Sequence, residues 1–255
     1  MATALITGGT SGIGAAFARA LAARGNDLVL VARDADRLAE TATQLKERYG
    51  IAVDTLSADL AVREDVLRVA DRVSSSEQPI DTLVNNAGFG IRARLLAEDP
   101  VPHEHGIDVM IRAVLILAGA AGRAMRDRGR GTIINVSSTA GFLTMGSYSA
   151  TKAYVTVYTE SLANELAGSG VHVTALLPGW VQTEFHQRAS IRAGAIPSVL
   201  WLNADDLVAA CLKDAAAGKV ISLPSVRYRL IFGIIRHLPR ATVRSISRRI
   251  TSGRH

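Results

Sequence analysis

Cysteine is almost absent from this sequence, since Cys211 is the only one among 255 residues. No internal disulfide can form, and a reducing compartment is predicted. No cluster of cysteine and histidine has the spacing of a zinc site, so we predict no bound metal and assign His103 and His105 to a solvated loop. The longest apolar run, Ala113–Gly122, is far shorter than the ~18 residues that span a bilayer.

No basic and apolar leader is predicted from the first residues of the sequence. The first residues, MATALITGG, are typical of a strand that runs into a glycine turn, so we expect a cytoplasmic protein. The composition is 48% hydrophobic and 20% charged, which is sufficient for a large core and argues against disorder.

Acidic residues are missing from the last thirty positions, Val226–His255, which contain eight arginines. The whole chain carries +6, so residues 1–225 sum to −2. Because this larger part has no basic excess, a nucleic-acid-binding function is not predicted.

Apolar and basic residues of this extension separate onto two faces of a predicted helix. The apolar face holds Val243, Ile246 and Ile250, and the basic face holds Arg240, Arg244 and Arg248. Several alternatives follow: contact with an anionic membrane surface, attraction of an acidic carrier, packing on a partner subunit or on the substrate site, or a frayed solvated end.

Short runs rich in Val, Ile and Leu alternate with longer amphipathic stretches along the first 225 residues. The predicted strands are Ala2–Thr7, Asp27–Ala32, Ala52–Ser57, Thr82–Asn85, Thr132–Ser137, His172–Leu177 and Lys219–Leu223. The predicted helices are Ile13–Arg24, Asp34–Tyr49, Arg63–Ser74, Ile107–Arg126, Tyr148–Ala167 and Asp205–Ala217, with Asp34 and Asp205 as N-caps.

This alternation predicts an α/β fold, a single doubly wound Rossmann-type domain over residues 1–225. Its strands are almost continuously apolar, which favours a mostly parallel seven-stranded sheet with helices on both faces. Residues 183–203 would form a substrate flap, and residues 226–255 a basic amphipathic extension. Ligands of such a sheet bind beyond the carboxyl ends of its strands.

The first strand runs into TGGTSGIG, Thr7–Gly14, directly before a helix. Glycines at 8, 12 and 14 allow a tight turn and a close approach of the backbone to a pyrophosphate at the helix N-terminus. The alternative is a purely structural turn.

The second strand ends in LVLVARD, where an acid would bind a ribose 2′-hydroxyl and an arginine a 2′-phosphate. Arg33 stands at the strand end with Asp34 after it, so NADP(H) is favoured over NAD(H). Alternatively, Arg33 is a solvated residue and Asp34 only a cap.

The other strands also end in polar or glycine-containing sequences. The third ends in SADL, with Asp59 and Leu60; the fourth in NNAG, Asn85–Gly88; the fifth in NVSS, with Ser138; and the sixth in PGWVQT, Pro178–Thr183. Ten residues after Ser138, Tyr148 and Lys152 lie one helical turn apart in YSATK.

Taken together, these motifs resemble the short-chain dehydrogenase/reductase family over about residues 2–225. The matching pieces occur in family order: TGxxxGIG, NNAG, the serine after the fifth strand, YxxxK and PG. The resemblance implies a nicotinamide-dependent oxidoreductase that reduces a ketone or aldehyde, or oxidises the alcohol.

The resemblance also implies residue roles. Tyr148 would be the general acid, with a phenol pKa lowered by Lys152 and the oxidised nicotinamide, Ser138 would hold the substrate oxygen, and Lys152 would bind the nicotinamide ribose. The implied cofactor-binding residues are Gly8, Thr10, Ser11, Gly12, Ile13, Gly14, Arg33, Asp59, Leu60, Asn86, Ala87, Gly88, Tyr148, Lys152, Pro178, Gly179, Val181 and Thr183. A homodimer or homotetramer through the fourth and fifth helices is implied as well.

The sequence departs from the family pattern in three places. Met110 stands where many members have an asparagine that holds a water, and a thioether is at best a weak acceptor. The spacing of ten between Ser138 and Tyr148 is shorter than the usual thirteen, which alters the substrate wall of Phe142, Leu143 and Met145. Ser11 replaces the basic residue that many NADP-preferring relatives carry, so the NADP(H) prediction depends on Arg33.

Aromatic residues in and around the predicted flap favour an apolar substrate, although ordinary packing explains them equally well. These residues are Trp180, Phe185 and Trp201. The second functional hypothesis is a dinucleotide-binding sensor or scaffold with little turnover, motivated by Met110.

Overall fold

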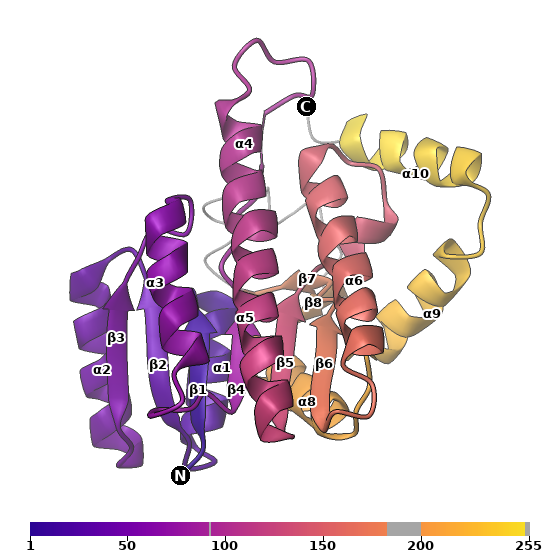
Figure 1. Cartoon of the computed structure of the whole chain (residues 1–255). Coiled ribbons are helices and arrows are strands. Elements are labelled where there is room, and N and C mark those ends of the chain that lie inside the picture. The colour runs from indigo at the N-terminus through magenta and orange to yellow at the C-terminus, as the bar shows by residue number, and fades with distance from the viewer. Residues whose placement is uncertain (92, 183–199, 253–255) are drawn as a thin grey trace.

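The structure, a computed structural model, describes residues 1–91, 93–182 and 200–252, with side chains as far as Arg249 (Figure 1). Its centre is a seven-stranded sheet in the order β3-β2-β1-β4-β5-β6-β9, and each neighbouring pair is parallel. The strands are β1 Thr3–Thr7, β2 Asp27–Ala32, β3 Val53–Ser57, β4 Thr82–Asn85, β5 Gly131–Val136, β6 Val171–Leu176 and β9 Ile221–Ser222. The predicted doubly wound fold is confirmed.

Helices cover both faces of this sheet because its strands are apolar on both sides, as in Ala4, Leu5 and Ile6 of β1, which are fully buried. One face packs against α1 Gly12–Ala22, α2 Ala35–Tyr49 and α8 Ala204–Ala216. The other packs against α3 Arg63–Ser74, α5 Ala113–Arg128 and α6 Ser147–Glu165.

Two predicted N-caps have different outcomes. Asp34 caps α2 as expected, with its carboxylate accepting a hydrogen bond from the backbone N–H of Arg37 at 3.0 Å. The prediction for Asp205 was wrong, because α8 begins one residue earlier and the side chain of Asn203 accepts from the N–H groups of Asp205 and Asp206. An asparagine side chain serves as well as an aspartate at this position.

The fourth helical region differs from its prediction. It begins at Val101 rather than Ile107, since Pro102 fits the first turn of a helix, and His103 and His105 are therefore helical residues and not a loop. α4, Val101–Ile107, continues through a π-helical turn, Asp108–Arg112, into α5. The longer helix and its π turn were not anticipated.

A pair of two-residue strands frames the segment that follows β6. β7 Trp180–Val181 pairs in parallel with β8 Trp201–Leu202, and the N–H of Gln182 donates to the carbonyl of Leu202 at 3.0 Å. Most of the predicted flap, residues 183–199, lies outside the described residues.

The basic extension forms two helices, α9 Val226–Ile235 and α10 Arg240–Ser252, where a single one was predicted. Figure 1 shows both on the edge of the molecule beyond α6, far from α2 and α3. Tyr228, Phe232 and Val243 are buried against the body of the chain. Among the described residues, no helix is both long enough and apolar enough to cross a membrane.

Candidate active site

The predicted motifs meet at the carboxyl edge of the sheet. The strand order reverses between β1 and β4, the position at which doubly wound sheets bind their ligands. Because the main-sheet strands are parallel, the sequences that follow each strand lie along one edge. The structure therefore brings the glycine turn, the NNAG sequence, Ser138 and the Pro178–Gly179 sequence to the same side of the fold.

The glycine turn after β1 is shaped so that only glycine fits at its key positions. Gly8 and Gly12 have φ angles of 66° and 53°, in the left-handed region. A Cβ on Gly14 would lie 2.0 Å from the carbonyl oxygen of Gly8. The first turn of α1 thus packs directly on the glycine loop, and Ser11 caps the helix without a side-chain hydrogen bond. Such a backbone cradle fits the pyrophosphate of a dinucleotide.

Asn86 fixes this turn to the end of β4 through its side-chain amide. Its side-chain N–H donates to the carbonyls of Thr7 at 2.9 Å and Gly8 at 3.2 Å. The Thr7 hydroxyl in turn accepts from the N–H groups of Asn86 and Ala87, at 2.9 and 3.1 Å. The NNAG sequence therefore has a structural role at the switch point. The part that the Thr7 hydroxyl plays in this contact was not predicted from the sequence.

The residues predicted around the adenosine occupy the neighbouring strand ends. Arg33 is exposed after β2, and its carbonyl accepts a hydrogen bond from the Ser57 hydroxyl at 3.1 Å. The carboxylate of Asp59 accepts from the N–H of Ala61 at 2.9 Å, whereas Leu60 is buried in the core. Asp34 follows Arg33 directly in the sequence, and its carboxylate is engaged in capping α2.

Ser138, Tyr148 and Lys152 lie close together in spite of the short spacing between the first two. After β5 the chain makes a 3₁₀ turn over Thr139–Phe142, and Gly146, with a φ of 82°, leads into α6. The hydroxyls of Ser138 and Tyr148 share a hydrogen bond. The ammonium nitrogen of Lys152 lies 5.8 Å from the centre of the Tyr148 ring.

Burial sets the ionisation of this group. It raises the pKa of Tyr148 to about 12, an effect that the Ser138 hydrogen bond opposes. Burial also lowers the pKa of Lys152 to about 8, and the Lys152 ammonium donates to the carbonyl of Val136 at 2.9 Å. In the chain alone, desolvation therefore outweighs the lowering of the Tyr148 pKa that was expected from Lys152.

The Lys152 side chain gives a testable pH dependence of stability. Its pKa is lower in the folded than in the unfolded state, so the unfolded chain binds more protons between about pH 8 and 10.5 and stability rises with pH there. We expect wild type to gain on the order of 2 kcal/mol of unfolding free energy over this range relative to Lys152→Met. Urea unfolding at both pH values measures it. Lys213→Met, which removes an exposed lysine from α8, should gain as much unfolding free energy over this pH range as wild type does. If Lys152→Met and Lys213→Met showed the same gain, the burial argument would be contradicted.

Met110 lies in the π turn, fully buried, on the other side of the lysine. A Cβ on Gly88 would stand 3.1 Å from the sulfur of Met110 and 3.6 Å from the Lys152 nitrogen. The thioether of Met110 and the amine of Lys152 therefore both lie beside Gly88. π turns concentrate at functional sites, and this one adjoins the predicted centre.

Tyr228 of α9 is a site residue that the sequence did not reveal. Its hydroxyl accepts from the N–H of Trp180 at 3.0 Å and donates to the carbonyl of Leu200 at 2.9 Å. Its ring lies on Gly179, where a Cβ would come within 2.0 Å of it. Val181 is buried beside this contact, and the predicted carboxamide contact Thr183 lies outside the described residues.

A second contact ties the extension to the loop after β5. The hydroxyl of Ser247, in α10, accepts from the N–H of Thr144 at 3.0 Å, and the rings of Phe142 and Phe232 lie 5.4 Å apart. His103 links α4 to the start of α6 through a 2.8 Å hydrogen bond with the Ser147 hydroxyl.

Comparisons with known proteins agree with this geometry. The profile of the short chain dehydrogenase family matches residues 2–193. The chain is 36% identical over 218 residues to 2-dehydro-3-deoxy-D-gluconate 5-dehydrogenase of Bacillus subtilis, covering 80% of this chain and 84% of that one.

Solved structures extend the likeness to nearly the whole chain. A short-chain dehydrogenase from Sphingobium yanoikuyae in complex with NADPH has a TM-score of 0.84 and 34% identity, covering 94% of this chain and 96% of that one. A bulky-bulky ketone specific alcohol dehydrogenase from Comamonas testosteroni has a TM-score of 0.79 and 30% identity over the same shares. The chain therefore belongs to the short-chain dehydrogenase family of oxidoreductases.

Proposed function

We propose that the protein is an NADP(H)-dependent carbonyl reductase whose general acid is Tyr148. The observation that carries this proposal is the hydrogen-bonded pair of Ser138 and Tyr148 with Lys152 beside it. A bound nicotinamide would supply or accept the hydride. A binding protein without turnover has no use for a phenol held between a hydroxyl and an ammonium, so the sensor or scaffold hypothesis is not favoured.

The chain's own residues account for the proton. Tyr148, with a pKa raised by burial, is protonated at neutral pH and can donate its proton to a carbonyl oxygen. Ser138 is fixed by accepting from the N–H of Ala140 at 3.1 Å and would hold the same oxygen. Lys152, held at the carbonyl of Val136, stabilises the phenolate that remains. Proton transfer between the Tyr148 hydroxyl and the substrate oxygen is reversible, so the same site would also serve alcohol oxidation.

The preference for NADP(H) is proposed from Arg33. An exposed guanidinium at the end of β2 can form charge-assisted hydrogen bonds to a 2′-phosphate, and the nearby Asp34 carboxylate is occupied as a helix cap. The NADPH-bound relative supports this choice of cofactor.

Arg33→Ala tests the cofactor proposal. NADPH affinity should fall by about 1.5–3 kcal/mol, the range for hydrogen bonds to charged groups, whereas NADH affinity should stay nearly constant. Fluorescence titration with both cofactors measures this. Arg24→Ala, an exposed arginine just beyond α1, serves as the control. Tighter binding of NADH by wild type would overturn the preference and leave the reductase proposal intact.

The proposed substrate is a hydrophobic ketone or aldehyde. Phe142, in the turn after β5, packs against Phe232 of α9, and the rings of Trp180 in β7 and Trp201 in β8 lie 6.3 Å apart. The Comamonas relative, named for bulky ketones, supports an apolar substrate, whereas the Bacillus relative is named for a sugar acid. The aromatic surroundings favour the ketone, and a screen of both classes with NADPH oxidation as the readout separates them.

A homodimer or homotetramer is also proposed, through the outer faces of α5 and α6. The predicted apolar run of α5 is mostly buried within the chain, but Leu115 remains exposed, as do Tyr154 and Val157 of α6. A measured solution mass above that of one 27.0 kDa chain, lowered by Val157→Glu, would support this assembly.

A further inference from the structure

We propose that the outer surface of α9 and α10 binds an anionic lipid bilayer. This surface has an apolar part and a basic part. In each part, the residues on the outer face of the helix are exposed, and those on its inward face are buried. The outer faces of these two helices carry none of the residues assigned to catalysis or cofactor binding.

The apolar part is a stripe along α9. Val226, Leu230 and Ile234 recur every fourth residue, so they share one helix face, and they are 61%, 66% and 65% exposed. Tyr228 and Phe232 occupy the inward face of the same helix. α9 is thus apolar on both sides, although only one side is covered by the chain. Exposed apolar residues that cluster in this way mark an interaction surface.

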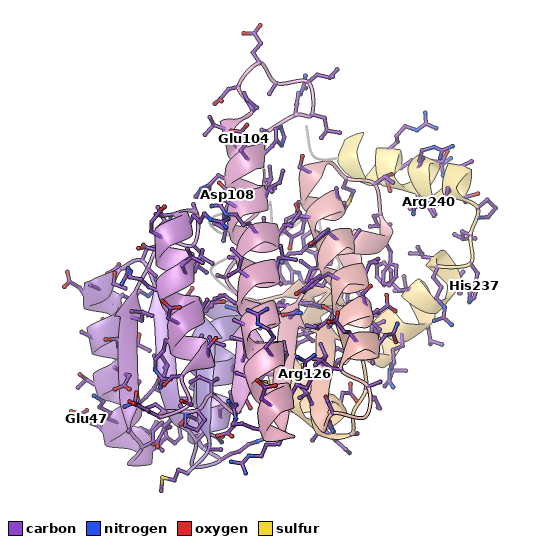
Figure 2. The ribbon with its side chains drawn as sticks, viewed as in Figure 1. Glu47, Glu104, Asp108, Arg126, His237 and Arg240 are labelled. Atoms are coloured by element: carbon purple, nitrogen blue, oxygen red, sulfur yellow. The ribbon has the colours of Figure 1, made fainter. Side chains whose placement is uncertain are left out.

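The basic part surrounds this stripe and continues along α10. Every arginine with a described side chain in the extension is exposed: Arg227, Arg229, Arg236, Arg240, Arg244, Arg248 and Arg249. In α10, the inward face is instead formed by Val243 and Ser247, which are buried. Figure 2 shows His237 and Arg240 at the outer corner between the two helices, on the side of the molecule opposite Glu47.

Charge complementarity selects the occupant. The extension contains eight arginines and no acid, whereas residues 1–225 sum to only −2. A second copy of the chain carries a net charge of +6 and would be repelled overall, whereas a bilayer with anionic headgroups is negatively charged over its whole surface. Leucine and isoleucine side chains would enter the headgroup boundary, and the arginines would reach the lipid phosphates.

The position of this surface has a consequence for substrate access. The inner sides of the same helices contact the loops at the carboxyl edge, through Tyr228 on Trp180 and Ser247 on Thr144. A bilayer on the outer side would lie one helix layer from these loops. An apolar carbonyl compound dissolved in the membrane would then be delivered close to the site.

Co-sedimentation of the full chain with vesicles tests the proposal. Binding is expected with phosphatidylcholine vesicles that contain phosphatidylglycerol, weaker binding with phosphatidylcholine alone, and a loss of binding at high salt. Arg229→Gln/Arg240→Gln/Arg244→Gln should lower the affinity about fivefold per arginine, on the order of 100-fold in total. Leu230→Ser/Ile234→Ser should lower it about tenfold or more.

Matched variants elsewhere on the chain serve as controls. Arg24→Gln/Arg48→Gln/Arg63→Gln removes the same charge from exposed positions of the body, and Leu67→Ser/Leu96→Ser removes exposed leucines. Both should bind vesicles as wild type does. Equal sedimentation with neutral and anionic vesicles, or none with either, would overturn the proposal. A fall in solution mass of the Leu230→Ser/Ile234→Ser variant would also overturn it, by assigning the stripe to contacts between copies.

Discussion

Tyr148→Phe is expected to lower the rate of carbonyl reduction by about 10²–10⁴-fold, the contribution typical of a positioned general acid. The substitution removes only the phenol oxygen, which shares a hydrogen bond with Ser138, and it keeps the ring that packs in this region. Cofactor affinity should remain nearly unchanged, because the glycine turn follows β1 and Arg33 follows β2, whereas Tyr148 is part of α6. Steady-state kinetics together with NADPH titration measure both quantities.

Tyr154→Phe provides the matched control on the same helix. Tyr154 lies farther along α6, 37% exposed, with its ring stacked on Tyr158 at 5.9 Å and away from Ser138. It should retain full activity. If Tyr148→Phe also retained activity, the proton would come from another group, and the catalytic proposal would be wrong. If wild type bound a nicotinamide cofactor but turned over no carbonyl compound, the sensor or scaffold hypothesis would regain support.

The fold was predictable because its signals are local. Most main-sheet strands are short apolar runs. Some helix ends also carry a recognisable residue, such as the cap Asp34 before α2 and Gly50, in the left-handed region, after it. The predicted strand ends differ from those observed by at most two residues. The spacing of Tyr148 and Lys152 within one helix is also local information, and their proximity followed directly from it.

The contacts that the sequence could not reveal depend on long-range packing. Tyr228 reaches Trp180 across 48 positions of the chain, and Ser247 reaches Thr144 across 103. No local pattern distinguishes these residues from other tail residues. The π turn at Met110 was likewise not predicted, because nothing in the local sequence separates it from an ordinary α-helix. The effect of burial on the pKa of Tyr148 was also not anticipated, since burial is a property of the assembled fold.

Gly14→Ala should abolish dinucleotide binding and strongly destabilise the fold. The added Cβ would lie 2.0 Å from the carbonyl oxygen of Gly8 and 2.5 Å from the amide nitrogen of Asn86. Neither atom can move freely, because the Gly8 N–H donates to Val31 at 2.7 Å and the Asn86 amide bridges Thr7 and Gly8. Overpacking costs about 1–3 kcal/mol in ordinary cores and more where backbone must shift, so we expect a loss of at least the upper figure. Thermal unfolding and NADPH titration measure the two effects.

Gly119→Ala separates this steric argument from the general effect of alanine in a helix. Gly119 lies inside α5, and the nearest atom to an added Cβ is the flexible end of Arg123, at 3.6 Å. Alanine there should stabilise the chain by about 0.5–1 kcal/mol, since it gains helix propensity without a clash. If the unfolding free energy falls in Gly14→Ala and rises in Gly119→Ala, the close contact between α1 and the turn requires glycine at position 14. If Gly14→Ala instead bound NADPH normally, the turn would have room that the structure does not give it, and the assignment of the pyrophosphate to this turn would fail.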